Sequence, residues 1–244
     1  MTVLIESVRA ELAPTGKLRA GVNYGNFILA AKNPTTGESS GVAITLMHNI
    51  SRHLGVPAEI IAYDDVAAMG DAAPDNVWDI AFLGFAPQRE ALMSFTSPYL
   101  EIDATYLVRE GSPFKTVVDV DRVGVRVAAH ARANYELFLR RNLKHAHLEA
   151  AQNGEAAFEL FAADKVDVLA GLTQSLIGLA ARLPGAHMLE GRFMSVQQSV
   201  AVPKGRDIGL AFLRHVVEEA KASGMIANAI AALDVKGVSV APPA

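Results

Sequence analysis

The stretch WDIAFLGFAPQRE, residues 78–90, decides the fold class. It begins with a short apolar run, residues 79–83, of the kind that forms a buried parallel strand, because such strands are covered on both faces. Pro87 follows shortly after, where its fixed φ angle suits the first turn of a helix. A buried strand that leads into a helix belongs to a β-α-β unit, so the stretch predicts an α/β protein.

The same alternation extends along the chain in both directions. Strands are predicted over residues 18–22 and 58–63, with a helix over residues 43–54 between them. After the deciding stretch the rhythm restarts, and strands and helices alternate over residues 125–129, 135–143, 155–163, 166–170 and 174–183. This repetition predicts two blocks, each built on a mostly parallel sheet with covered faces.

Two extended stretches, residues 104–108 and 199–202, connect the blocks, and a polar turn with a glycine follows each. A chain that leaves the first block, builds the second and then returns forms two lobes joined by two hinge strands. We assign residues 1–108 and 200–244 to lobe one and residues 109–199 to lobe two. In such folds a ligand binds between the lobes, at the carboxyl ends of the strands.

The composition of the 244 residues limits the functional classes. The formal net charge of -4 gives no basic field, so nucleic acid is not an expected partner. The absence of cysteine rules out disulfides, thiol catalysis and thiolate metal sites. No apolar run approaches the roughly 18 residues that span a membrane. His145 and His147 are interpreted as solvated side chains at a helix end, since zinc needs three or four convergent ligands, and no metal or cofactor is expected.

The N-terminus carries no recognisable secretory signal. Residues 1–5 form a short apolar run, which Glu6, Arg9 and Glu11 interrupt. A signal needs a basic start, an apolar stretch of roughly 7–15 residues and a cleavage site of small residues. Either a signal was removed from this chain, which would place the protein in the periplasm, or the protein never had one, which would place it in the cytoplasm. The residues leave both open.

Seven short motifs occur in an order and spacing typical of one family. They are KLRAGV at 17–22, TGE at 36–38, WDIA at 78–81, PQRE at 87–90, FTSPY at 95–99, VDV at 166–168 and AVPKG at 201–205. From about residue 18 to residue 233 the chain resembles the family 3 solute-binding proteins, the amino-acid-binding type of ABC transporter component. The resemblance implies a type II periplasmic-binding-protein clamp that captures a small solute and presents it to the membrane component of an ABC transporter. We expect a monomer with no catalytic activity.

Arg89 matches the family arginine that clamps a ligand carboxylate. A planar guanidinium can hold both carboxylate oxygens through parallel, charge-assisted hydrogen bonds. The alternative is an ordinary helix arginine paired with Glu90 or another acid. The flanking motif favours the binding role, and the expected ligand is therefore a small anion.

Gly84 follows the predicted strand at a position where the family presents backbone N–H groups to the same carboxylate. Glycine allows such a close approach of the backbone. The family often has a hydroxyl residue at the positions of Phe82 and Gly84, and this chain has none. Phe82 and Phe85 are candidates for apolar walls of the ligand pocket, although Phe82 is equally consistent with plain core.

Further candidates lie in loops that contact the ligand in the family. Tyr24 and Asn26 follow the first strand and could donate hydrogen bonds, or serve as simple turn residues. Asp65 lies in another contact loop, although an exposed turn acid is the simpler interpretation. In lobe two, Arg132 and Asn134 precede a helix whose free N–H groups attract anions; Asn134 can cap that helix, and Arg132 can be a ligand contact or a solvated loop residue.

The segment VLAGLTQ, residues 168–174, departs from the family. Members that bind α-amino acids place an aspartate near Leu172 to pair with the ligand ammonium, and an ammonium buried against leucine would be costly. Thr173, beside it, remains a candidate contact. The sequence therefore predicts a carboxylate ligand, an amino acid or organic acid, that need not carry an amine. Acids that could replace the aspartate are Asp65, Glu101 and Asp103.

Two other functions stay open on the same fold. Cyclohexadienyl dehydratases resemble this family and carry a glutamate shortly after the position of Leu172, because their chemistry needs an acid to protonate a leaving hydroxyl. This chain has Thr173, Gln174 and Ser175 there, which argues against that chemistry. The other alternative is a ligand-sensing domain of a larger receptor.

Overall fold

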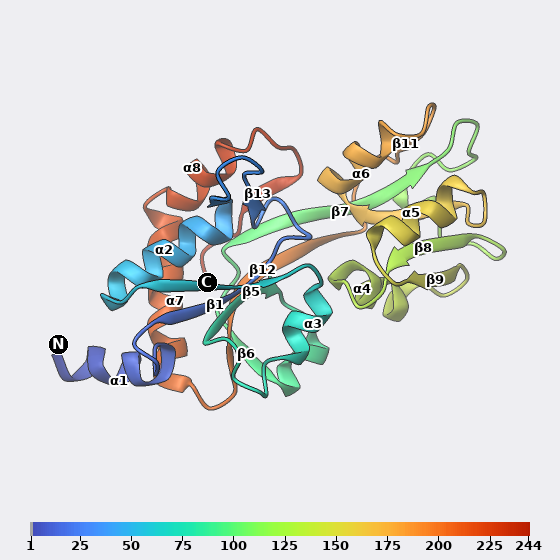
Figure 1. Ribbon diagram of the computed structural model, residues 1–244. Helices are drawn as coiled ribbons and strands as arrows, with labels where there is room; N and C mark the ends of the chain where they lie inside the picture. The colour runs from blue at the N-terminus through green and yellow to red at the C-terminus, as the bar shows by residue number, and fades with distance from the viewer. Residues whose placement is uncertain (1) are drawn as a thin grey trace. The chain divides into compact units, whose positions relative to one another are not determined.

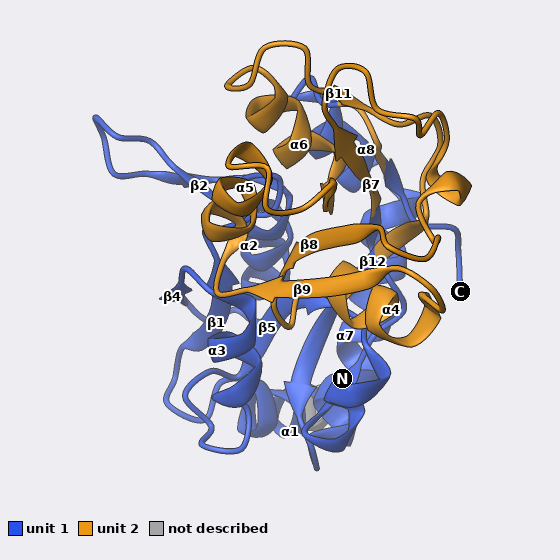
Figure 2. Ribbon diagram, turned by 90° about the vertical axis from the view of Figure 1, so that its right-hand side faces the viewer, with its two compact units in different colours: residues 1–101, 197–235, 239–244 blue, residues 102–196, 236–238 orange. Residues whose placement is uncertain are grey.

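The computed structural model describes residues 2–244 and is shown in Figure 1. Met1, part of the apolar run at the N-terminus, lies outside the described residues. The chain forms two compact units, coloured separately in Figure 2. Unit 1 comprises residues 1–101, 197–235 and 239–244, and unit 2 comprises residues 102–196 and 236–238. Helices and strands alternate within both units, which confirms the predicted α/β class.

The units divide inside two long strands, β7 (Leu100–Val108) and β12 (Met194–Pro203), which contain both predicted hinge stretches. The boundaries at 101/102 and 196/197 lie before those we assigned to the lobes, at 108/109 and 199/200. Pairing explains the difference, because residues 104–108 of β7 pair with β10 in unit 2 and residues 198–201 of β12 pair with β5 in unit 1. The short segment 236–238, which belongs to unit 2, was not anticipated. That the two units act as lobes of a clamp stays a prediction.

The sheet of unit 1 has the strand order β4-β1-β5-β12, and β6 also pairs with β12. Three of these strands are parallel, with Leu18 opposite Ala58 and Ala20 opposite Ile80. β12 runs antiparallel to β5 and to β6. The bounds are β1 (Leu18–Asn23), β4 (Ala58–Tyr63), β5 (Ile80–Gly84) and β6 (Met93–Phe95).

In unit 1 the helix predicted over residues 43–54 is present as α2. The apolar face of α2 is buried, and Gly55 ends that helix in the left-handed conformation with φ 64°. Trp78 is fully buried and donates from Nε1 to the carbonyl of Met69 at 3.0 Å. The elements are α1 (Thr2–Leu12), α2 (Val42–Leu54), α3 (Val66–Asp71), the 3₁₀ helix η1 (Pro87–Ala91), α7 (Asp207–Ala222), α8 (Met225–Ala231), and the strand pair β2 (Ala31–Lys32) and β3 (Ser39–Ser40).

The sheet of unit 2 repeats this arrangement in the order β7-β10-β8-β9, with β11 paired to β7. β8, β9 and β10 are parallel, and β7 is antiparallel to β10. The elements are η2 (Val117–Asp119), β8 (Arg126–His130), α4 (Asn134–Asn142), β9 (His147–Ala151), α5 (Gly154–Ala162), β10 (Val168–Leu172), α6 (Thr173–Ala180) and β11 (His187–Met188). The last strand, β13 (Val238–Val240), straddles a unit boundary.

Strand β9 corrects one sequence interpretation. His147 was assigned to a helix end, but it begins β9 and lies opposite Arg126 of β8. The strand escaped prediction because most of its side chains are exposed, so it lacks an apolar pattern.

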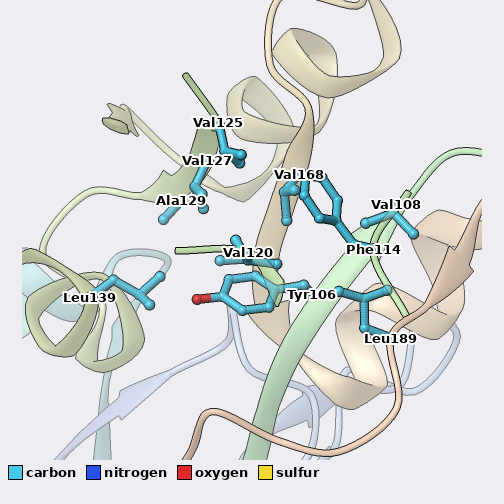
Figure 3. Packing of buried hydrophobic residues seen from close by; sticks show 11 residues of the cluster. Tyr106, Val108, Phe114, Val120, Val125, Val127, Ala129, Leu139, Val168 and Leu189 are labelled. Carbon is cyan, nitrogen blue, oxygen red and sulfur yellow. The ribbon is translucent and has the colours of Figure 1, made fainter. Parts of the chain in front are cut away.

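The core of unit 2 packs around Tyr106 of β7 (Figure 3). Its phenol oxygen points toward Leu139 of α4, and burial raises the pKa of this phenol. Helix α4 packs on this cluster through Tyr135, Phe138 and Leu139, and its C-cap Leu143 also packs there. Unit 2 thus has a hydrophobic core of its own, as a separate lobe requires.

Candidate functional site

In unit 1 the candidate residues follow the carboxyl ends of the parallel strands. Asn23 at the end of β1 lies opposite Tyr63 at the end of β4, and β5 runs parallel to β1 on its other side. Gly84 is the last residue of β5, and the loops after these strands carry Tyr24, Asn26, Asp65 and Phe85. Parallel strands end at a common edge, which in open α/β sheets is where ligands bind.

The structure brings Arg89 and Gly84 into direct contact. Pro87 opens η1, which turns Arg89 back toward the end of β5, and its Nη1 donates to the carbonyl of Gly84 at 2.6 Å. Arg89 is only 8% exposed, which differs from the exposed helix arginine of the alternative interpretation. A guanidinium has five N–H donors, so a ligand carboxylate would share this group with the Gly84 carbonyl.

The two candidate phenylalanines differ in their surroundings. Phe82 is fully buried, with its ring edge-on to Tyr99 at a centroid distance of 6.2 Å. Phe85 is 36% exposed and lies edge-on to Phe95 at 5.4 Å. The burial of Phe82 favours its role in the core, whereas Phe85 has surface to offer to a ligand.

The loop after β1 is held by polar groups of its own and by residues of β2 and β3. The hydroxyl of Tyr24 lies 2.6 Å from that of Ser39, and the Lys32 ammonium lies 5.5 Å from the centroid of the Tyr24 ring. The side-chain oxygen Oδ1 of Asn26 accepts from the backbone N–H of Ile28 at 3.2 Å, which is turn chemistry. Sequence reasoning missed Ser39, whose place in a two-residue strand gives no pattern to detect.

Asp65 begins α3 as its N-cap. Its carboxylate accepts hydrogen bonds from the backbone N–H groups of Ala67 and Ala68. A carboxylate at a helix N-terminus satisfies donors that would otherwise lack partners. This role agrees with the simpler sequence interpretation of a turn acid.

In unit 2 the candidates follow the ends of β8 and β10, which are parallel, with Val168 opposite Val127. Arg132 has a positive φ of 62°, and its backbone N–H donates to the buried carboxylate of Glu136 at 3.0 Å. The expected cap is wrong in detail, because Ala133 is the N-cap of α4 and Asn134 is its first residue. The α4 start is fixed instead through Glu136.

Thr173 is the first residue of α6, and its hydroxyl donates to the carbonyl of Asp103 at 3.0 Å. Gly237 packs against it, since a Cβ on Gly237 would lie 3.1 Å from that of Thr173. The side chain of Gln174 donates to the carbonyl of Lys236. A turn at Gly237 is readable from the sequence, but no signal there indicates its partner.

The acids considered as replacements near Leu172 are already engaged. Asp103 accepts from Arg192 at 2.9 Å and from the Ser195 hydroxyl at 2.7 Å. Glu101 accepts a long hydrogen bond of 3.4 Å from Gln197. Because Asp103 and Glu101 are engaged in these contacts, neither is an obvious replacement for the aspartate that the family places near Leu172.

One side chain at these strand ends, that of Tyr63, has a shifted pKa. Burial raises the pKa of the Tyr63 phenol, so it stays protonated at neutral pH. Among residues 2–244, no group of three or more acidic, histidine or cysteine side chains is placed to hold a metal ion. In the same range, none of the helices has the length and apolar character needed to cross a bilayer.

The chain is similar in sequence and in fold to known proteins that bind amino acids. The L-cystine-binding protein TcyJ of Escherichia coli (strain K12) is 21% identical over 193 residues, which are 78% of this chain and 72% of TcyJ. An ancestral arginine-binding protein bound to arginine superposes with a TM-score of 0.75 at 21% identity, covering 90% of this chain and 99% of that one. The ancestral amino acid-binding protein AncCDT-1, a precursor of cyclohexadienyl dehydratase, gives a TM-score of 0.75 at 19% identity, covering 91% and 97%.

These likenesses confirm the predicted two-lobed, type II periplasmic-binding-protein fold. The sequence model of one family matches residues 18–232, nearly the same range over which the sequence resembles that family. The chain therefore belongs to the bacterial extracellular solute-binding proteins, family 3.

Proposed function

We propose that this solute-binding protein captures a small ligand with a carboxylate, an amino acid or organic acid, and delivers it to an ABC transporter from the periplasm. The observation that carries the proposal is the pair of Arg89 and Gly84 at the end of β5, in contact at 2.6 Å. A nearly buried guanidinium is suited to a carboxylate, because the hydrogen bonds are charge-assisted and little exposed to water.

The proposed ligand contacts are Arg89 and Gly84 in unit 1, and Arg132, Asn134 and Thr173 in unit 2. The partner would be a small anion and the membrane component of a transporter, with the protein acting as a monomer. Binding requires no covalent step, so we propose that the protein is not an enzyme.

We further propose that the ligand need not carry an amine. Leu172 stands where family members place an acid for the ammonium, and Asp103 and Glu101 are occupied by other side chains. The relatives named for cystine and arginine bind ligands with amines. Selectivity is therefore the point on which this protein is expected to differ from them.

Thermal unfolding against a ligand panel tests the proposal. The panel holds cystine, arginine, other amino acids, dicarboxylates, aromatic acids and 2-oxo acids. A ligand at a hundredfold excess over its Kd stabilises the folded state by about 2.7 kcal/mol, which is a clear rise in Tm. We expect at least one amine-free acid to raise the Tm. A rise with amino acids alone would contradict the role assigned to Leu172.

The variant Arg89→Ala should abolish the rise in Tm that an amine-free acid induces, and Arg89→Lys should restore only part of it, because lysine keeps the charge but not the planar fork. Arg109→Ala is the matched control. Arg109 also donates to a backbone carbonyl, that of Val166 at 3.0 Å, but it lies outside the candidate edges. It should lower the Tm and leave the ligand-induced rise unchanged. A full rise in Arg89→Ala would remove Arg89 from the site.

The alternative function is a cyclohexadienyl-dehydratase-like enzyme, favoured by the likeness to AncCDT-1. That protein is itself described as amino acid-binding and as a precursor of the enzyme. Incubation with prephenate or arogenate, followed by detection of phenylpyruvate or phenylalanine, decides between the two. Turnover above the uncatalysed rate would overturn the binding-only proposal.

A further inference from the structure

A hollow in unit 1 is not lined by Arg89 or Gly84, although their chain neighbours Glu90 and Phe85 lie on its border. It has a volume of about 540 Å³ and is formed by β6, β12, the turn after β12 and the first half of α7, labelled in Figure 1. That volume is within the range of small-molecule sites. Residues that decide its chemistry are Phe85, Phe95, Ser199, Lys204, Asp207 and Arg214.

Ser199 provides the first sign of a ligand. It lies on β12 opposite Leu83, is 1% exposed and lines the hollow. Its hydroxyl oxygen has no hydrogen-bond partner among the described residues. A buried hydroxyl without a partner costs roughly 1–3 kcal/mol, and a polar group placed in the hollow would recover it.

The charges around the hollow provide the second sign. Lys204, Asp207 and Arg214 line it from the turn after β12 and from α7, with Glu90 on the η1 side. Within residues 2–244 none of these four forms an ion pair within 4.0 Å. Arg214 makes only a long contact of 3.5 Å with the carbonyl of Phe95. Two cations and two anions therefore face one hollow without neutralising each other.

The hollow also has an apolar wall, which includes Phe85, Phe95 and Leu210. Phe85 and Phe95 meet edge to face at 5.4 Å, and Leu210 lies between Asp207 and Arg214 on the same stripe of α7, since residues at i, i+3 and i+7 share a helix face. Aromatic rings in this arrangement present both an edge and a face to a third apolar group. The hollow thus combines an apolar wall with separated charges of both signs.

We infer that this hollow is a second ligand site, which takes a small zwitterion with an apolar side chain, of the size of one amino acid. The carboxylate is received by Arg214 and by the Ser199 hydroxyl, the ammonium by Asp207 or Glu90, and the side chain by Phe85 and Phe95. The site is independent of Arg89 and of whether the ligand proposed there carries an amine.

Isothermal titration calorimetry with three probes tests the inference: L-phenylalanine, phenylacetate and phenethylamine. The zwitterion should bind at least about tenfold more tightly than either single-charge analogue, since each charge-assisted hydrogen bond is worth about that factor. This binding should persist in Arg89→Ala. It should weaken at least about tenfold in Arg214→Gln and in Ser199→Ala, and stay unchanged in Arg52→Gln, an exposed arginine of α2 outside the hollow.

Three results would overturn the inference. One is the absence of phenylalanine binding to the wild-type protein. Another is binding that Arg89→Ala abolishes and Arg214→Gln leaves intact, which would put the zwitterion at the first site only. The last is equal affinity for phenylacetate, which would refute the zwitterion. Conversely, the rise in Tm that the ligand panel induces could persist in Arg89→Ala and be lost in Arg214→Gln. That result would refute the proposed function and leave this site standing.

Discussion

Unit 1 and unit 2 each carry an arginine–aspartate pair at the start of their parallel strands, with the same geometry. In unit 1, Asp79 accepts from the backbone N, Nε and Nη2 of Arg19 at 3.0, 3.0 and 2.8 Å. In unit 2, Asp167 accepts from the same three atoms of Arg126 at 2.8, 3.1 and 2.8 Å. Each aspartate N–H donates in return to the carbonyl of its arginine, at 2.8 and 2.9 Å. In each unit, the arginine–aspartate pair thus continues the hydrogen bonding between two parallel strands.

The two pairs differ in burial and in the number of cations. The side chain of Asp79 is 0% exposed, whereas that of Asp167 is 34% exposed. Asp79 also accepts from Nη1 of Arg206 at 2.9 Å, and Arg206 is itself only 12% exposed. The same hydrogen bonds therefore join a desolvated three-residue cluster in unit 1 and a solvent-screened pair in unit 2. Equal geometry does not imply equal energy, because removing one partner of a buried cluster leaves an unpaired charge away from water.

The largest expected effect comes from breaking the buried cluster. Asp79→Ala should lower the free energy of unfolding by about 3–5 kcal/mol, since Arg206 and Arg19 lose their shared carboxylate. Urea unfolding followed by fluorescence measures this in unit 1, because Trp78 is the single tryptophan of the chain. Asp75→Ala, an exposed aspartate of the same unit, is the control and should change stability by less than about 0.5 kcal/mol. A loss below about 1 kcal/mol for Asp79→Ala would show that water reaches the two arginines.

A smaller effect is expected from the matching change in unit 2. Asp167→Ala should cost about 1 kcal/mol, because the pair is screened and the exposed Arg126 can be solvated when its partner is gone. Urea unfolding followed by circular dichroism, which reports both units, is the measurement. If Asp167→Ala cost as much as Asp79→Ala, the difference in burial would not control the energy.

The comparison also shows what the sequence can predict. The motifs WDIA at 78–81 and VDV at 166–168 mark the start of β5 and β10, and strand periodicity places β1 and β4 to within one residue. These features are local, so they can be read from the chain. The arginines that meet the aspartates lie 60 and 41 positions away, and their pairing depends on strand order.

The residues of the candidate site likewise divide into those with a local sequence pattern and those whose contacts depend on distant segments. Gly84, Arg89 and Asp65 could be found because each follows a strand or starts a helix within a recognisable pattern. Contacts such as Thr173 with Gly237 could not, because they join segments distant in the sequence through a turn with no apolar pattern. Strand β9 was missed for a related physical reason, since a mostly exposed strand lacks the alternation that marks burial.

The smallest expected effect is a dependence of unit 2 on pH. The side-chain hydrogen bond from Arg126, assisted by its backbone N–H, lowers the pKa of the Asp167 carboxyl against the opposing effect of burial. A lowered pKa in the folded state adds stability that is present above the unfolded value, about 3.9, and is lost as the pH falls through the folded value. The stability difference between wild type and Asp167→Asn should therefore be a few tenths of a kcal/mol at pH 6 and shrink toward zero near pH 2, because solvent screens the pair. Urea unfolding at a series of pH values measures it, with Asp75→Asn as the control that should show no such trend. A difference that grows as the pH falls would mean that Arg126 does not favour the ionised form of Asp167.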